Sequence, residues 1–283
     1  MINVVSFSGG RTSAYLCHLM KEKYGDDVAF VFCDTGAEHP KTYDFIRKVN
    51  HELRLNLVCL RADITQEMGI RTGYKVVSID DIGPDLKPFR DLVAKYGVPY
   101  YPNGRQCTGM MKTAPFIEYC DEQFGKGQYI NWLGIRADEP RRLNPKSGVR
   151  YLADISDFEK QDVLNWWAKK DYDLECPEWL GNCAFCIQKK VSKVALAAID
   201  EPEMANDFIN MVDESARRKD GKKYDSMYET GLSLKQIRDN FELFDRDHVM
   251  QLVVRGRRLD TGSCSESCEP FSDQGELFGL EYK

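Results

Sequence analysis

Apolar and polar residues follow two different periods along the first part of the chain. Short apolar runs recur, and between them apolar positions repeat every three to four residues over longer stretches. The short runs predict buried strands, and the longer stretches predict amphipathic helices. The predicted strands are 2–7, 28–33 and 57–60, and the helices between them are 12–24 and 41–53. Strands that alternate with helices predict a doubly wound, Rossmann-like α/β fold around a parallel sheet.

The pattern weakens after the third predicted strand. Residues 65–103 contain Gly and Pro without strong periodicity, apart from one predicted helix at 86–96, so we expect a lid-like insertion there. A helix at 112–123 and a strand at 129–134 follow. The doubly wound sheet should be complete by about residue 155, and the α/β domain is predicted to span residues 1–156.

Helical periods dominate the remaining sequence, with predicted helices at 159–169, 190–199, 203–218 and 233–241. This predicts a mainly helical C-terminal subdomain over residues 157–261, which carries a Pro- and Cys-containing loop at 175–186. The last stretch, 262–283, is rich in Ser, Glu and Gly. Such a composition predicts a mobile tail.

The composition and charge of the chain indicate a globular protein and argue against a membrane protein. With 283 residues, of which 42% are hydrophobic and 30% charged, the chain can bury a substantial core. No apolar segment reaches membrane-spanning length and the N-terminus has no signal-peptide pattern, so we expect a cytoplasmic protein with no membrane partner. The net charge of −6 argues against nucleic-acid binding over the whole surface. Any contact with nucleic acid should be local or made through a partner protein.

A glycine-rich segment, Ser-Gly-Gly-Arg-Thr-Ser at 8–13, lies between the first predicted strand and the first predicted helix. Glycines there let the backbone approach a phosphate, and the helix N-terminus supplies N–H groups and a positive dipole end. The segment is neither a Walker loop nor the Gly-x-Gly-x-x-Gly dinucleotide motif. A simple tight turn is the alternative interpretation.

The segment resembles the PP-loop, Ser-Gly-Gly-x-x-Ser, of the N-type ATP pyrophosphatases and the phosphoadenylyl-sulfate reductases. Two further segments resemble motifs of the same superfamily and follow in the same order. Residues 33–40, Cys-Asp-Thr-Gly-Ala-Glu-His-Pro, are similar to Asn/Asp-Thr-Gly-x-x-x-Pro, and residues 134–142 are similar to Gly-Val/Ile-Arg-x-x-Glu/Asp-Ser-x-x-Arg. One departure is Thr12, where many PP-loops carry Asp.

The resemblance implies an adenine nucleotide alpha hydrolase-like fold and a set of ATP-binding residues. These residues are Ser6, Phe7, Ser8, Gly9, Gly10, Arg11, Thr12, Ser13, Asp34, Thr35, Gly36, Glu38, Gly134 and Arg136. Arg136 is expected to contact phosphates, and Lys112 and Arg141 to neutralise charge as pyrophosphate leaves. Asp34 and Glu38 are expected to help hold Mg²⁺ or the ribose.

Four of the ten cysteines are candidate metal ligands. Cys107 lies in a segment that resembles the superfamily's Cys-Cys/Thr-x-x-x-Lys-x-x-Pro motif, and Cys176, Cys183 and Cys186 form a C-x6-C-x2-C array. Four thiolates can bind zinc or an iron-sulfur cluster, and unrelated buried thiols are a third interpretation. The resemblance favours a [4Fe-4S] cluster.

The other six cysteines fall into two groups. Four lie in apolar patterns and are expected to be small buried side chains: Cys17, Cys33, Cys59 and Cys120. Cys264 and Cys268 lie in the predicted tail and are candidate catalytic thiols that carry or reduce a persulfide. An exposed pair without a role is the alternative, and the Glu-Cys-Gly-x-His tail motif of the reductases is missing.

Two chemistries compete within this superfamily. In the first, ATP adenylates a target oxygen and pyrophosphate leaves, and a sulfur species from a cysteine desulfurase then displaces AMP. In the second, a sulfated nucleotide is reduced and sulfite leaves. Cys107 is followed by Thr108 rather than by a second Cys. This resembles the ATP pyrophosphatase of DNA phosphorothioation systems, so thiolation of DNA or another nucleic acid is the favoured hypothesis. A nucleotide or redox sensor without turnover is a third.

Overall fold

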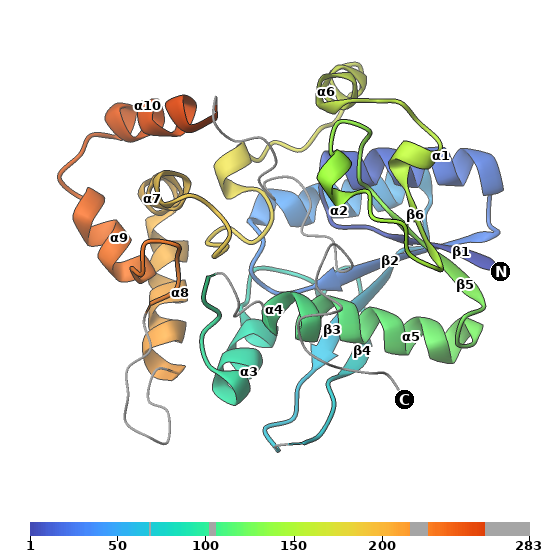
Figure 1. Ribbon diagram of the computed structural model, residues 1–283, viewed down its shortest axis with the longest axis horizontal. Helices are drawn as coiled ribbons and strands as arrows, with labels where there is room; N and C mark the ends of the chain where they lie inside the picture. The colour runs from blue at the N-terminus through green and yellow to red at the C-terminus, as the bar shows by residue number, and fades with distance from the viewer. Residues whose placement is uncertain (68, 102–105, 216–225, 258–283) are drawn as a thin grey trace.

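The computed structural model describes residues 1–67, 69–101, 106–215 and 226–257. Its strands form one mixed sheet in the order β4-β3-β2-β1-β5-β6 (Figure 1). The strands are β1 (Ile2–Ser6), β2 (Val28–Asp34), β3 (Val58–Asp63), β4 (Gly73–Val77), β5 (Tyr129–Leu133) and β6 (Val149–Tyr151). All pairs are parallel except β3 with β4.

The strand order reverses on the two sides of β1. Its residue Val4 pairs with Ala29 of β2 on one side and with Asn131 of β5 on the other. Chain connections leave β1 and β5 in opposite directions across the sheet, which opens a crevice at the carboxyl ends of these strands. Such a switch point is where doubly wound folds bind ligands.

Helices cover both faces of this sheet (Figure 1). The α-helices of the described residues, with one π-helical turn, are α1 (Arg11–Tyr24), α2 (Pro40–Leu53), α3 (Lys87–Tyr96), α4 (Gln106–Thr108), the π-helical turn (Gly109–Thr113), α5 (Ala114–Phe124), α6 (Lys160–Trp167), α7 (Val191–Asp200), α8 (Pro202–Ser215), α9 (Leu234–Phe241) and α10 (Arg246–Arg257). Successive residues of a strand point to opposite faces. Val4 therefore packs with Phe116 of α5, whereas Val5 belongs to the larger core with Leu16 and Ile46.

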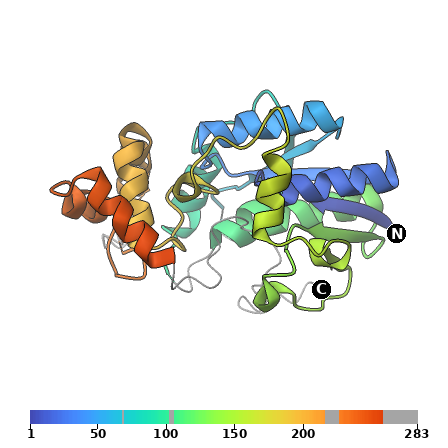
Figure 2. The same cartoon turned by 90° about the horizontal axis from the view of Figure 1, so that it is seen from above.

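The C-terminal region is helical, as predicted. Helices α7, α8, α9 and α10 gather at one end of the molecule, beside α3 (Figures 1 and 2). The ring of Phe208 on α8 lies 5.3 Å from that of Phe89 on α3 and 5.6 Å from that of Phe185. These contacts make the core of the helical region continuous with the core of the α/β region.

The structure differs from the sequence-based expectation at three elements, namely β4, the three-residue strand β6 and helix α10. The region 65–103 contains β4, an antiparallel edge strand whose side chains are mostly exposed or half-buried, so it lacks the apolar run of a central strand. Helix α10 was not expected, because charged residues flank its short apolar run at both ends. The predicted tail 262–283, with Cys264 and Cys268, lies outside the described residues. None of the helices described is both long and apolar enough to span a membrane.

Candidate functional site

The glycine loop closes on itself at the carboxyl end of β1. The Ser8 backbone N–H donates to Ser13 Oγ at 3.2 Å, and the hydroxyls of Ser8 and Ser13 lie 2.8 Å apart. Ser13 Oγ also donates to the Gly10 carbonyl at 3.1 Å. Gly10 is the N-cap of α1, so the positive end of a 14-residue helix faces the crevice without a capping side chain. This arrangement suits a bound anion.

Two glycines allow the elements around the loop to approach one another. Gly9 has a φ of +80°, and a Cβ there would lie 2.9 Å from Ile46 Cδ1. A Cβ on Gly134 would lie 2.9 Å from the Cα of Ser13, which is backbone and cannot turn away. The end of β5 is therefore pressed directly against the start of α1.

Arg136 lies at the same junction. Its Nη1 donates to Thr12 Oγ1 at 3.2 Å and its Nε to Asp138 Oδ1 at 2.8 Å, and the residue is 6% exposed. Its backbone N–H donates to Glu139, which also pairs with Arg142. The guanidinium is thus held against the first turn of α1. Arg141, in the neighbouring 3-10 turn, is exposed.

Arg11 points away from the phosphate loop. Its Nε and Nη2 donate to the two carboxylate oxygens of Asp173 at 2.7 and 3.0 Å, and Nη2 also donates to the Leu174 carbonyl. The Trp167 indole N–H donates to the Arg11 carbonyl at 3.0 Å. These contacts join the start of α1 to the segment that precedes Cys176.

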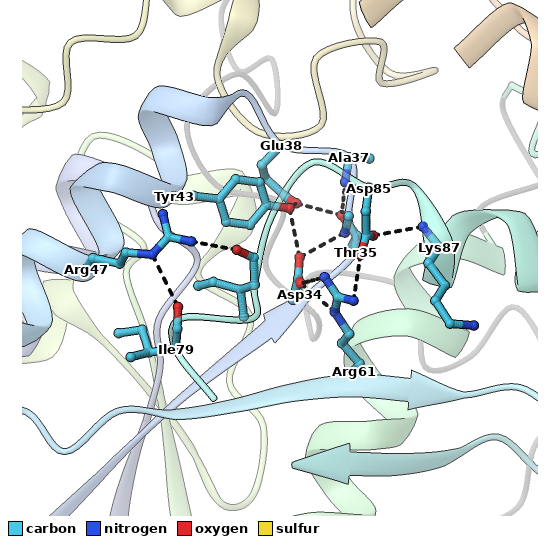
Figure 3. A network of polar contacts seen from close by, with 12 residues as sticks. Asp34, Thr35, Ala37, Glu38, Tyr43, Arg47, Arg61, Ile79, Asp85 and Lys87 are labelled. Atoms are coloured by element: carbon cyan, nitrogen blue, oxygen red, sulfur yellow. Dashed lines mark hydrogen bonds and ion pairs between the residues drawn. The ribbon is translucent and has the colours of Figure 1, made fainter. Parts of the chain in front are cut away.

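The second predicted motif forms a buried polar network after β2 (Figure 3). Asp34 Oδ1 accepts from the Gly36 N–H at 2.9 Å and from the Tyr43 hydroxyl at 2.8 Å. Its Oδ2 pairs with Arg61 at 2.7 Å. Burial and the charge of Glu38 raise the pKa of Asp34, and Arg61 opposes that rise. In this structure both carboxylate oxygens of Asp34 therefore stabilise the conformation of the loop that follows β2.

Glu38 connects this network to Lys112 and to the cysteine array. Its Oε2 accepts from Thr35 Oγ1 at 2.7 Å, and its Oε1 lies 3.4 Å from Lys112 Nζ and 3.8 Å from Cys183 Sγ. The Cys183 thiol is also 3.6 Å from Thr35 Oγ1, and the Ala184 N–H donates to the Ala37 carbonyl at 3.0 Å. The fold therefore brings together three predicted groups, namely the second motif, Lys112 and one thiol.

The cysteine loop also borders the glycine loop. One pocket is lined on one side by 8–12 and Thr42, and on the other by Leu174, Cys176 and 177–178. Cys176 is 5% exposed. Its burial raises the pKa of the thiol, while Lys189 and the Thr42 hydroxyl oppose that rise. A predicted metal ligand and the predicted phosphate loop thus share one pocket.

Lys189 is buried inside the cysteine loop. Its Nζ donates to the carbonyls of Trp179 and Ala184 at 2.8 and 2.9 Å. Burial lowers the pKa of Lys189 to about 8, and Cys186, Cys183 and Cys176 oppose that shift. Three of the four predicted metal ligands therefore act electrostatically on one ammonium group.

In the part of the chain that the structure describes, no three His, Cys, Asp or Glu side chains converge closely enough to hold a single metal ion. Cys107 is half-buried in α4, apart from the loop that carries the other three cysteines in sequence. The [4Fe-4S] cluster at Cys107, Cys176, Cys183 and Cys186 therefore stays a prediction.

The four cysteines expected to be core residues are buried, as predicted: Cys17, Cys33, Cys59 and Cys120. Burial raises the pKa of Cys33 and of Cys59 to about 12, so these thiols stay protonated and unreactive. Sequence reasoning missed Tyr43, Arg61 and Lys189. A lysine three residues after a Cys-x-x-Cys pair was a usable signal for the last of these.

The chain is similar to several known proteins. The family model described as the phosphoadenosine phosphosulfate reductase domain matches residues 2–171. An uncharacterized nin region protein, ORF290, of Escherichia phage lambda is 50% identical over 290 residues, covering 99% of both chains. A phosphoadenosine 5'-phosphosulfate reductase of Proteus mirabilis is 31% identical over 103 residues, which are 32% of this chain and 42% of that protein.

A crystal structure of phosphoadenylyl-sulfate reductase from Candida auris, in a phosphate complex, aligns with a TM-score of 0.39 and 16% identity, covering 60% of this chain and 73% of that chain. The present chain thus spans nearly the whole phage relative but less than half of the Proteus reductase. The family match covers more than half of the chain and includes the glycine loop, Glu38 and Arg136. The chain therefore belongs to the phosphoadenosine phosphosulfate reductase domain family.

Proposed function

We propose that this chain is an ATP pyrophosphatase that activates a target oxygen for sulfur transfer, in DNA phosphorothioation or another nucleic-acid thiolation. One observation carries the proposal: Cys176 of the cysteine array and residues 8–12 of the glycine loop line the same pocket. An enzyme that couples nucleotide cleavage to sulfur chemistry needs this juxtaposition.

The crevice residues would act first on ATP. The glycine loop and the α1 N-terminus bind phosphate oxygens, and Arg136 adds a guanidinium at the first turn of α1. A target oxygen attacks the α-phosphorus, and pyrophosphate leaves with its charge neutralised by Lys112, Arg141 and Mg²⁺. The product is an adenylated target.

A persulfide then displaces AMP from the adenylated target through its terminal sulfur. The donor we propose is a cysteine desulfurase, and Cys264 and Cys268 are the candidate carriers: one carries the persulfide and becomes linked to the target by a disulfide bond, and the thiolate of the other cleaves that bond, so the thiolated target leaves and a Cys264–Cys268 disulfide forms. A [4Fe-4S] cluster bound by Cys107, Cys176, Cys183 and Cys186 would supply an anionic, redox-active centre at this loop. Because the chain has a net charge of −6, we propose that its contact with nucleic acid is confined to a local patch or made through a partner protein.

A reductase activity is the second candidate, because the Proteus relative is named as a phosphoadenosine 5'-phosphosulfate reductase. In that reaction a thiolate attacks the sulfur of the sulfated nucleotide, the nucleotide leaves, and a second thiol releases sulfite. Cys264 and Cys268 would have to supply these thiols. The missing Glu-Cys-Gly-x-His motif disfavours this candidate.

The test uses the full chain, purified anaerobically and reconstituted with iron and sulfide. One sample receives ATP and Mg²⁺, and two others receive adenylyl or phosphoadenylyl sulfate with dithiothreitol. The proposal expects AMP and pyrophosphate in equal amounts from ATP, since water can replace the missing target. Sulfite from a sulfated nucleotide, without pyrophosphate from ATP, would establish the reductase instead. Nucleotide binding with neither product would indicate a sensor.

A pair of matched variants tests whether ATP cleavage takes place in the crevice at the glycine loop. Arg136→Met removes the guanidinium at Thr12 and should lower ATP cleavage about 100-fold. Lys48→Met removes a half-exposed cation on the outer face of α2, paired with Glu52, and should leave ATP cleavage unchanged. Equal activity in Arg136→Met and the wild type would contradict the assignment of the crevice.

A further inference from the structure

A buried hydroxyl group without a partner among the described residues lies next to the glycine loop. It belongs to Thr42, which lies in the first turn of α2 and is 2% exposed. Among those residues, Thr42 Oγ1 has no hydrogen-bond partner. Folding removes such a hydroxyl from water without replacing the hydrogen bonds that it made there, and this costs stability. An unsatisfied polar group in a native fold is therefore a candidate ligand contact.

The hydroxyl borders the pocket that the glycine loop and the cysteine loop share. Thr42 lines this pocket together with residues 8–12. Its methyl group packs toward the glycine loop, since a Cβ at Gly9 would lie 3.1 Å from Thr42 Cγ2. The Cys176 thiol lines the pocket as well, but a thiol sulfur is a weak acceptor. A ligand with oxygen acceptors would supply the partner that Thr42 lacks.

The start of α1 lines the same pocket and offers backbone donors. Gly10 is the N-cap of this helix and makes no side-chain cap, and Arg11 and Thr12 follow it in the pocket wall. The first N–H groups of an α-helix have no partner within the helix, and the helix dipole is positive at this end. A hydroxyl donor beside such a helix start favours an oxyanion over a neutral ligand.

The charged side chains at the pocket also favour an anion. Arg11 is paired with Asp173 through two hydrogen bonds, so these two charges cancel. Glu178 lines the pocket, but its carboxylate lies 2.9 Å from Lys193 Nζ and 3.8 Å from Lys160 Nζ. Two lysines against one carboxylate leave a net positive charge at this wall, and such a charge attracts anions.

We propose that Thr42 is a phosphate-binding residue, whose hydroxyl donates to an oxygen of a nucleotide phosphate in the pocket at the start of α1. This inference rests on the proposed function only for the presence of a nucleotide, and it does not require that the nucleotide be cleaved. Arg136 contacts Thr12 but does not line this pocket. Thr42 and Arg136 therefore bind different oxygens of the phosphate chain.

Two substitutions of Thr42 have opposite expected effects. Thr42→Val removes the hydroxyl and keeps the shape, so the affinity for ATP and for inorganic pyrophosphate should fall about 10-fold, the loss of one hydrogen bond to a charged group. Without ligand, its midpoint of thermal unfolding should equal or exceed that of the wild type, because an unpartnered hydroxyl is gone. Thr42→Ser keeps the hydroxyl but loses the methyl group, so it should keep the affinity and unfold at a lower temperature.

Thr72→Val is the matched control. Thr72 is also buried, but its hydroxyl donates to Met110 Sδ at 3.5 Å and it does not line the pocket. This variant should leave every affinity unchanged. Calorimetric titration of each full-length variant with ATP, inorganic pyrophosphate and adenylyl sulfate, all with Mg²⁺, measures binding, and circular dichroism measures thermal unfolding. A loss of affinity for adenylyl sulfate alone would make sulfate the ligand and overturn the assignment to phosphate.

The remaining outcomes separate this inference from the proposed function. Wild-type affinity in Thr42→Val would refute the inference, even where ATP is cleaved. A ligand-free Thr42→Val chain that is much less stable than the wild type would show that the hydroxyl supports the fold instead. Binding of ATP without cleavage in the wild type, weakened by Thr42→Val, would refute the proposed function and support the inference. A wild-type chain that binds neither ATP nor pyrophosphate would overturn both.

Discussion

At the scale of single residues, the crevice depends on contacts between backbones as much as on functional groups. Gly134 shows this most clearly, because the nearest atoms to a Cβ at this position are the Cα and N of Ser13, at 2.9 and 3.0 Å. A side chain there would push the end of β5 away from the start of α1. That displacement would move Arg136 and the glycine loop relative to each other.

We therefore expect Gly134→Ala to lower both stability and nucleotide affinity, although it adds only one methyl group. The free energy of unfolding should fall by about 1–3 kcal/mol, the usual cost of overpacking. Nucleotide affinity should fall with it, because the loop shifts. Urea denaturation and calorimetric titration with ATP measure the two effects. Gly83→Ala is the matched control, since a Cβ there meets nothing within 4 Å, and equal losses in the two variants would contradict the packing argument.

The candidate site could be predicted from sequence where its residues lie in a contiguous motif. The 8–13 segment, Glu38, Lys112 and Arg136 were found in this way, and the fold brings Glu38 within 3.4 Å of Lys112. Tyr43 and Arg61 were missed, because an ordinary aromatic in a helix and an arginine in a strand carry no local signal. Their roles arise when β2, β3 and α2 meet, which no short window of sequence contains.

At the scale of elements, the sequence predicts the strands and helices that carry a local hydrophobic pattern and misses those that are defined by contacts with distant residues. Central strands such as β1 and β2 are apolar on both faces and stand out in the sequence. The edge strand β4 is exposed on much of its surface, so pairing with β3, rather than hydrophobic pattern, defines it. Helix α5 was expected from residue 112, but Gly109–Thr113 forms a π-helical turn before Pro115.

The ion pair between Arg11 and Asp173 joins two elements of the site, α1 and the segment before the cysteine loop. Its bidentate geometry predicts a coupling free energy of about 1 kcal/mol, the upper end for pairs with partly exposed side chains. A double-mutant cycle of Arg11→Met and Asp173→Asn, measured by urea denaturation, gives this value. The exposed i, i+4 pair Lys48–Glu52 is the control, expected near 0.3–0.5 kcal/mol. Zero coupling for Arg11–Asp173 would show that the pair does not hold the loops together.

The packing of α1 against α6 predicts a pH dependence of stability. His18 on α1 lies against the ring of Trp166 on α6, with centroids 4.8 Å apart. Burial lowers the pKa of His18 below its usual 6.5, and Glu22 partly opposes this. The unfolded chain therefore binds more protons than the folded chain between the folded pKa and 6.5, so His18 destabilises the fold increasingly as the pH falls below about 6.5.

His18→Gln should remove this contribution. The stability of the variant relative to the wild type should rise as the pH falls from about 7 to 5, which urea denaturation at each pH measures. His51→Gln serves as the control, because the side chain of His51 is 82% exposed. A stability difference between His18→Gln and the wild type that does not vary with pH would refute the argument.

At the scale of the whole molecule, the α/β region and the helical region share one core. The rings of Phe89, Phe185 and Phe208 meet between α3 and α8, and buried residues connect from Val5 in the sheet to Val253 in α10. The sequence pattern distinguished the two regions correctly by their secondary structure. It could not show that they pack together, because Phe89 and Phe208, whose rings meet, are more than a hundred positions apart.

A shared core predicts that the two regions unfold together. Phe208 is 3% exposed, so Phe208→Ala should lower the free energy of unfolding by about 3–5 kcal/mol through the cavity it leaves. Because the core is continuous, calorimetry should show one transition for the wild type and a single, lower transition for the variant. Phe244→Ala, at a side chain on a residue that is 46% exposed, should change stability by less than about 1 kcal/mol. Two separate transitions, of which Phe208→Ala shifts only the lower one, would mean that the helical region folds as an independent unit. The cysteine loop, which lies between the two regions in sequence, would then be a linker rather than part of the core.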